Sequence, residues 1–107
     1  MGGGRIDALR EMLAQTPGDR DLRYFLATEC FQIGRFEEAL EHLEKYFETG
    51  DDEGMGFKMR GTCLFRLGRT DEALSCLEEG LLSALRHHHS DLAADIEETL
   101  EQLFPKT

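Results

Sequence analysis

Apolar residues recur along this chain at spacings of three and four, which place side chains on one face of an α-helix. Near the C-terminus, for example, Leu92, Ile96 and Leu100 form one such stripe, and acidic residues fill most of the positions between them. β-branched residues are sparse, and the chain has only two prolines. The pattern therefore predicts an all-α fold with six helices, at about 5–15, 19–33, 36–48, 54–67, 71–88 and 90–104.

The residues between these segments are typical of helix ends. Asp19 is expected to cap the second helix, and Thr70 the fifth, because short polar side chains accept hydrogen bonds from the first free backbone N–H groups. Gly34 and Gly68 stand where a helix ends in a left-handed residue. Residues 49–52 form a longer break. The short connections at the two glycines predict antiparallel neighbouring helices.

The sequence repeats itself with a period of 34 residues. Aligned without a gap, 22–47 and 56–81 share nine of 26 positions, among them the pairs Gly34/Gly68 and Phe31/Phe65. The first helix follows the same period, since Leu9, Leu43 and Leu77 are each 34 residues apart, as are Ile6, Leu40 and Leu74. A fixed period of this length predicts stacked helical hairpins. Such units have no internal active site, which favours a binding scaffold over an enzyme.

The period divides the chain into unequal parts. We expect a half repeat at 5–18, full repeats at 19–52 and 53–86, and a capping helix at 90–104, all in one domain over 5–104. Residues 1–4 contain three consecutive glycines and are expected to be a flexible leader or a scar from expression engineering.

The repeat positions resemble the tetratricopeptide repeat, a family of 34-residue helical hairpins. The first full unit carries the family's positions as Arg23, Leu26, Ala27, Cys30, Ala39 and Leu43, and the second as Phe57, Arg60, Gly61, Leu64, Ala73 and Leu77. Arg23 departs from the family's aromatic residue, and Arg60 from its leucine. The resemblance covers about residues 5–88 and implies an α–α superhelix that binds protein or peptide partners without catalysis.

In this family the first helix of each hairpin lines a concave groove, which implies a set of candidate binding residues here. These residues are Tyr24, Thr28 and Phe31 in one repeat and Lys58, Thr62, Phe65 and Arg66 in the next. Three of them recur with the period, as Tyr24/Lys58, Thr28/Thr62 and Phe31/Phe65. The fourth helix and its turn hold cations but no acid, so we expect a partner with acidic groups.

The overall charge of −10 argues against nucleic acid or an anionic membrane as the partner. The three cysteines form no CxxC motif and lie in apolar helical positions, so we interpret them as buried thiols of a reduced, cytoplasmic protein. No catalytic or cofactor-binding motif is found, so neither enzymatic activity nor a cofactor is expected.

Two alternatives to the partner-binding hypothesis remain. The first helix has no preceding helix to cover its apolar stripe, which would favour a homodimer and a structural role in assembly. The run His87–His89 suggests a metal-dependent function, although consecutive helical positions point about 100° apart and cannot converge on one ion. His42 stands alone among acidic residues and is expected at the surface.

Overall fold

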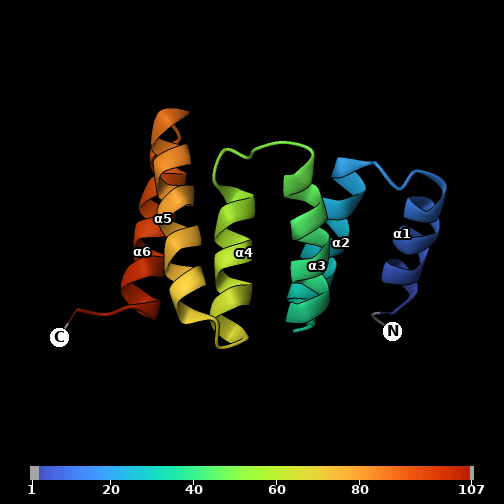
Figure 1. Cartoon of the computed structure of the whole chain (residues 1–107), viewed down its shortest axis with the longest axis horizontal. Coiled ribbons are helices and arrows are strands. Elements are labelled where there is room, and N and C mark those ends of the chain that lie inside the picture. The colour runs from blue at the N-terminus through green and yellow to red at the C-terminus, as the bar shows by residue number, and fades with distance from the viewer. Residues whose placement is uncertain (1–2, 107) are drawn as a thin grey trace. The chain divides into compact units, whose positions relative to one another are not determined.

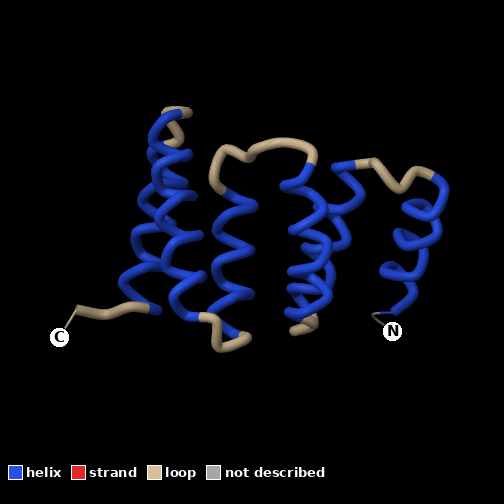
Figure 2. The backbone as a smooth tube through the Cα atoms, viewed as in Figure 1, coloured by secondary structure: helices blue, strands red, loops and turns tan. Residues whose placement is uncertain are grey.

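The computed structural model describes residues 3–106, and this part of the chain contains six helices and no strand (Figures 1 and 2). The helices are α1 (Gly3–Gln15), α2 (Arg20–Gln32), α3 (Phe36–Glu48), α4 (Met55–Arg66), α5 (Thr70–Arg86) and α6 (Ser90–Leu103). The all-α prediction is confirmed. None of these helices combines the length and the apolar character that crossing a membrane requires.

The helix ends lie within two residues of the predicted positions. The largest differences are at α1, which begins at Gly3, and at α5, which ends at Arg86. Gly3 and Gly4 of the expected leader are therefore helical, while Met1 and Gly2 lie outside the described residues.

The chain forms two compact units that meet in the sequence between Gly50 and Asp51. The N-terminal unit contains α1, α2 and α3, and the C-terminal unit contains α4, α5 and α6. The boundary falls in the longer break expected at 49–52. Within the units, the closest packing joins the two helices of each hairpin, α2 with α3 and α4 with α5.

Left-handed residues turn the chain at three helix ends, two of them predicted. Gly34 has φ +79° and Gly68 has φ +82°. The next backbone N–H in each case donates back into the helix, at 2.9 Å from Arg35 to the Cys30 carbonyl and at 2.8 Å from Arg69 to the Leu64 carbonyl. Such bonds satisfy the free carbonyls of the last turn. The third position, between α5 and α6, is taken by His88 with φ +59°.

One predicted cap is confirmed and the other is wrong. The Leu22 N–H donates to the Asp19 carboxylate at 3.1 Å, as the sequence predicts. Thr70, by contrast, is the first helical residue of α5, and Arg69 occupies the cap position without a side-chain cap bond. The guanidinium of Arg69 instead donates to both carboxylate oxygens of Glu72, at 2.9 and 2.7 Å.

The apolar positions of the repeat form the cores of the two units. Leu43 and Leu77, which are 34 residues apart, are both fully buried. Leu9, one period earlier, is only partly buried, since α1 packs on α2 and on no second helix to the same extent. The side chains buried in each unit are Ile6, Leu13, Leu22, Leu26, Ala27, Cys30, Ala39, Leu40, Leu43 and Tyr46, and then Phe57, Cys63, Leu64, Ala73, Cys76, Leu77, Ala84, Ala93 and Ile96.

Glycines allow α4 and α5 to approach closely. A Cβ added at Gly61 would lie 2.6 Å from the Leu77 Cγ, and one added at Gly80 would lie 2.7 Å from the Phe57 Cβ. The repeat's small positions therefore fix the distance between the two helices of this hairpin.

Candidate partner-binding faces

The four candidate residues of α4 lie along one side of the C-terminal unit, next to α6 and the segment that follows it. The Lys58 ammonium is 2.7 Å from the Asp95 carboxylate of α6. The Phe65 ring meets the Phe104 ring edge to face, with centroids 5.5 Å apart. The Thr62 hydroxyl donates to the Lys58 carbonyl at 2.9 Å, and Arg66 is exposed in the last turn. All four are surface residues, and two have partners from outside α4.

The ion pair between Lys58 and Asp95 bears on the expected acidic partner. The Lys58 side chain is 27% exposed, so solvent reaches the pair and weakens it. An acidic group of a partner would therefore compete with Asp95 for the same ammonium.

The three candidate residues of α2 lie within the N-terminal unit and face α3 in part. The Tyr24 ring is 5.3 Å from the Tyr46 ring, and the Phe31 ring meets the Phe36 ring edge to face at 5.6 Å. The Thr28 hydroxyl donates to the Tyr24 carbonyl at 2.9 Å. Each of the three is half-buried, with part of its surface left for another molecule.

Within its own unit, each face repeats the geometry of the other. Thr28 and Thr62 both donate to the carbonyl four residues earlier, and Phe31 and Phe65 both pack edge to face on a phenylalanine. The repeat therefore preserves the conformation of these side chains as well as their identity. The sequence did not identify the aromatic partners Phe36 and Phe104, because neither lies on the first helix of a hairpin.

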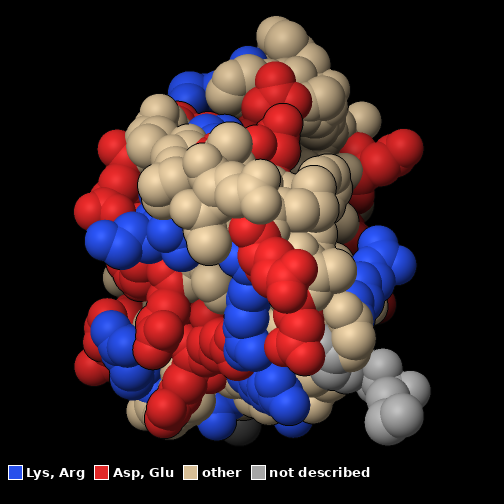
Figure 3. All heavy atoms as spheres, turned by 90° about the vertical axis from the view of Figure 1, so that its right-hand side faces the viewer, with Lys and Arg blue, Asp and Glu red and all other residues tan. Residues whose placement is uncertain are grey.

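A polar network inside the N-terminal unit was missed by the sequence analysis. Arg10 of α1 donates to the Glu38 carboxylate of α3, and Arg23 of α2 donates to the His42 Nδ1 of α3 at 3.2 Å. The His42 side chain is only 12% exposed, so the expectation of a surface histidine is wrong. Burial by α2 explains the difference. Figure 3, which looks onto the α1 end of this unit, shows basic and acidic side chains intermixed there.

The burial of these groups shifts their pKa values. Burial lowers the pKa of His42, and the nearby Arg23 guanidinium lowers it further. The hydrogen bond from Arg10 lowers the pKa of Glu38. Burial, followed by the charge of Glu38, raises the pKa of the Cys30 thiol to about 11. The network therefore holds His42 neutral, Glu38 ionised and Cys30 as a thiol at neutral pH.

Cys30, Glu38 and His42 place three donor atoms within 4.8 Å of one another, which is a metal-like cluster. Its chemistry does not suit a cation. Arginine can only donate, so His42 accepts at Nδ1 and carries its proton on Nε2, the nitrogen nearer Glu38. The thiol is protonated, and Arg10 already occupies the Glu38 carboxylate. We interpret the cluster as the polar contact that joins α1, α2 and α3.

The three histidines after α5 do not converge on a common point. The His87 Nδ1 lies 2.8 Å from the Ser83 carbonyl, and the His89 Nε2 lies 2.8 Å from the Glu53 carboxylate. The left-handed backbone at His88 forms the turn between the two helices. Among the described residues, the only metal-like cluster is the one in the N-terminal unit. The three histidines thus shape a turn between α5 and α6.

All three cysteines are buried and unpaired, as the sequence predicted. Cys76 donates to the Phe57 carbonyl at 3.3 Å. Phe57 and Cys76 are one period after Arg23 and His42, so a contact that is apolar in the second repeat is polar in the first. The replacement of the family's aromatic residue by Arg23 is accompanied by a histidine that accepts from it.

Comparison with known proteins agrees with the repeat pattern. Two tetratricopeptide repeat families match the chain, one over residues 2–58 and one over residues 59–79. No curated protein matches. A solved structure described as the crystal structure of MamA has the same fold, with a TM-score of 0.72 at 18% identity, and the match covers 97% of this chain and 69% of that chain. The chain therefore belongs to the tetratricopeptide repeat family.

Proposed function

We propose that this protein binds a segment of a partner protein, without catalysing a reaction, through the first-helix faces of α2 and α4. Its family is generally a non-catalytic protein-interaction fold. The observation that carries the proposal is the duplicated surface, in which a hydroxyl and a half-buried phenylalanine hold the same conformation on both helices. The core needs neither hydroxyl, because both bond within their own helix.

The C-terminal face would supply both affinity and orientation. The exposed part of Phe65 offers apolar contact, which is the kind of residue that dominates protein interfaces. Lys58 and Arg66 would attract an acidic group, and Lys58 would exchange Asp95 for the partner's carboxylate. Because the chain as a whole is strongly acidic, these cations would define where such a group binds.

The test is a screen of an array of extended peptides that combine acidic and aromatic residues, followed by calorimetry with the strongest binder. Lys58→Glu and Phe65→Ala should each weaken binding by about fivefold or more, which is about 1 kcal/mol. Lys45→Glu serves as the charge control, because Lys45 is exposed on α3. Unchanged affinity in both variants, with the helical circular dichroism retained, would refute the assignment of this face.

Self-association is a second candidate function, and the surface of α1 favours it. Met12 is 52% exposed and Leu9 is only partly buried. An interface between copies would cover both side chains. Sedimentation equilibrium over micromolar concentrations should then show a dimer that Met12→Glu dissociates. A monomer at all concentrations would exclude this function.

A further inference from the structure

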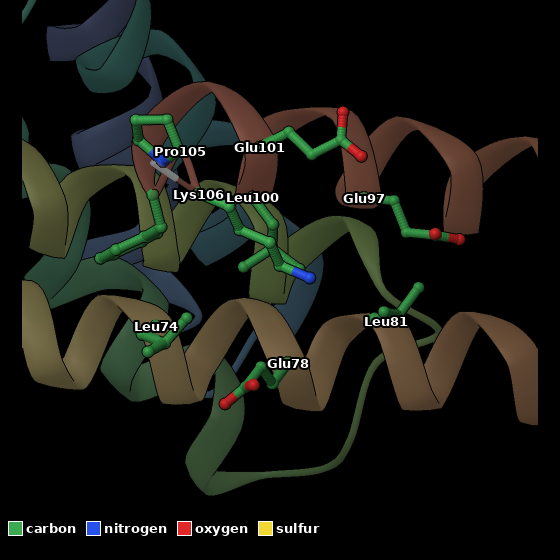
Figure 4. Close-up of a pocket in the computed structure, with 9 residues that line it drawn as sticks. Leu74, Glu78, Leu81, Glu97, Leu100, Glu101, Pro105 and Lys106 are labelled. Carbon is green, nitrogen blue, oxygen red and sulfur yellow. The ribbon is translucent and has the colours of Figure 1, made fainter.

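A groove runs between α5 and α6 in the C-terminal unit and is open to solvent (Figure 4). Its volume is about 630 Å³. Leu74 and Leu81 point up from α5 and Leu100 points down from α6, so the floor is apolar. Glu78, Glu97 and Glu101 line its edges. An apolar floor with charged edges is typical of a surface that binds an amphipathic helix.

The N-terminal unit shows what covers a junction of the same kind. There α1 precedes α2 as α5 precedes α6, and α3 lies against both. Glu38 of α3 bonds to Arg10 of α1 and lies beside Cys30 of α2. Ile6 of α1 is only 1% exposed, whereas Leu74, two periods later, is partly exposed. The covering element in the N-terminal unit is therefore a helix.

The charges at the two junctions are opposite. Arg10 of the N-terminal unit corresponds, two periods later, to Glu78 of the groove. The covering helix α3 meets Arg10 with an acidic residue, Glu38. A helix in the α5–α6 groove would need a basic residue at that place, and Glu97 and Glu101 add to the requirement. The cation Lys106 lies at one end only.

The groove also has a defined length. Leu74, Leu81 and the exposed Leu85 lie on one stripe of α5. At 1.5 Å per residue this stripe spans about 16 Å, or about three helical turns.

We propose that the α5–α6 groove binds a helix of a partner protein, about three turns long, with an apolar stripe flanked by lysine or arginine. A second copy of this chain is a poorer fit, because α3 carries five glutamates and α1 has equal numbers of arginines and acidic residues. The proposal is independent of the first-helix faces, since neither Lys58 nor Arg66 lines the groove.

The test uses designed peptides of about 14 residues with a fluorescent label and an alanine-rich helical background. One has leucines at helical spacing with flanking lysines, the second replaces the lysines with glutamates, and the third has the first composition in shuffled order. Fluorescence anisotropy should show binding of the lysine peptide alone, weaker at about 0.3 M than at about 0.05 M salt.

Variants of the chain locate the site. Glu101→Lys should weaken binding of the lysine peptide about five- to tenfold, because it turns attraction into repulsion. The matched control is Glu98→Lys, which makes the same charge change at an exposed position of α6 outside the groove. Glu78→Gln and Glu101→Gln remove charge without a bulky apolar change, so they keep the test valid if Leu100→Glu unfolds the unit.

Three results would overturn the proposal. Equal binding of the shuffled or glutamate peptide would show non-specific attraction, as would equal losses for Glu98→Lys and Glu101→Lys. A dimer that Leu100→Glu dissociates would assign the groove to a second copy. Lys58→Glu should leave the affinity for the lysine peptide unchanged, so failure here is separate from failure of the proposed function.

Discussion

Replacing Gly80 by alanine tests whether α4 and α5 touch as closely as their glycines allow. The added Cβ would lie 2.7 Å from the Phe57 Cβ, 3.4 Å from the Gly54 carbonyl oxygen and 3.6 Å from the Ile96 Cδ1. The first of these contacts is decisive, because the Phe57 Cβ is attached directly to the backbone. No rotamer change can move it away, so the helices themselves must separate.

Two opposing terms set the size of the effect. Alanine in place of glycine inside a helix stabilises it by about 1 kcal/mol. Overpacking a well-packed core costs about 1–3 kcal/mol, and a rigid contact under 3 Å belongs in the upper half of that range. We therefore expect Gly80→Ala to lower the free energy of unfolding by about 1–2 kcal/mol. For a domain of this size, each kcal/mol lowers the melting midpoint by about 4–8 °C.

Urea and thermal unfolding followed by circular dichroism provide the assay. Gly4→Ala is the control, since its added Cβ meets nothing within 4 Å, and it should leave stability unchanged or slightly raised. If Gly80→Ala instead stabilised the chain by about 1 kcal/mol, helix propensity alone would be acting. The close approach of α4 and α5 at Phe57 would then be wrong.

Three further predictions follow from the polar groups. Because the pKa of His42 is lowered on folding, the unfolded chain binds more protons below about pH 6.5, so stability should fall between pH 7 and pH 5 in urea titrations. The double variant Arg23→Phe with His42→Cys, which copies the second repeat, should flatten that dependence, and an unchanged slope would contradict the reasoning. His88→Gly should raise the melting midpoint by a few degrees, because a left-handed backbone favours glycine by up to about 1 kcal/mol. Cys30 should react with a thiol reagent more slowly than denatured chain at pH 8, since its pKa is raised to about 11, and equal rates would rule out its burial.

The sequence by itself determined the helices, their order and the family. The 34-residue period predicted that Leu43 and Leu77 occupy corresponding interior positions, and both are fully buried. The turns at Gly34 and Gly68 followed from the backbone conformation that glycine permits. These features depend on neighbours within a few residues, or on a pattern that the repeat states twice.

Only the tertiary structure decided which side chains meet across helices. Arg10 and Glu38 are 28 residues apart, and Lys58 and Asp95 are 37 residues apart, so no local pattern pairs them. The buried His42 was misjudged for the same reason. The rotation of each helix about its axis, set by packing against its neighbours, determines whether a polar residue faces solvent or another helix. The α5–α6 groove likewise exists only once those two helices are packed together.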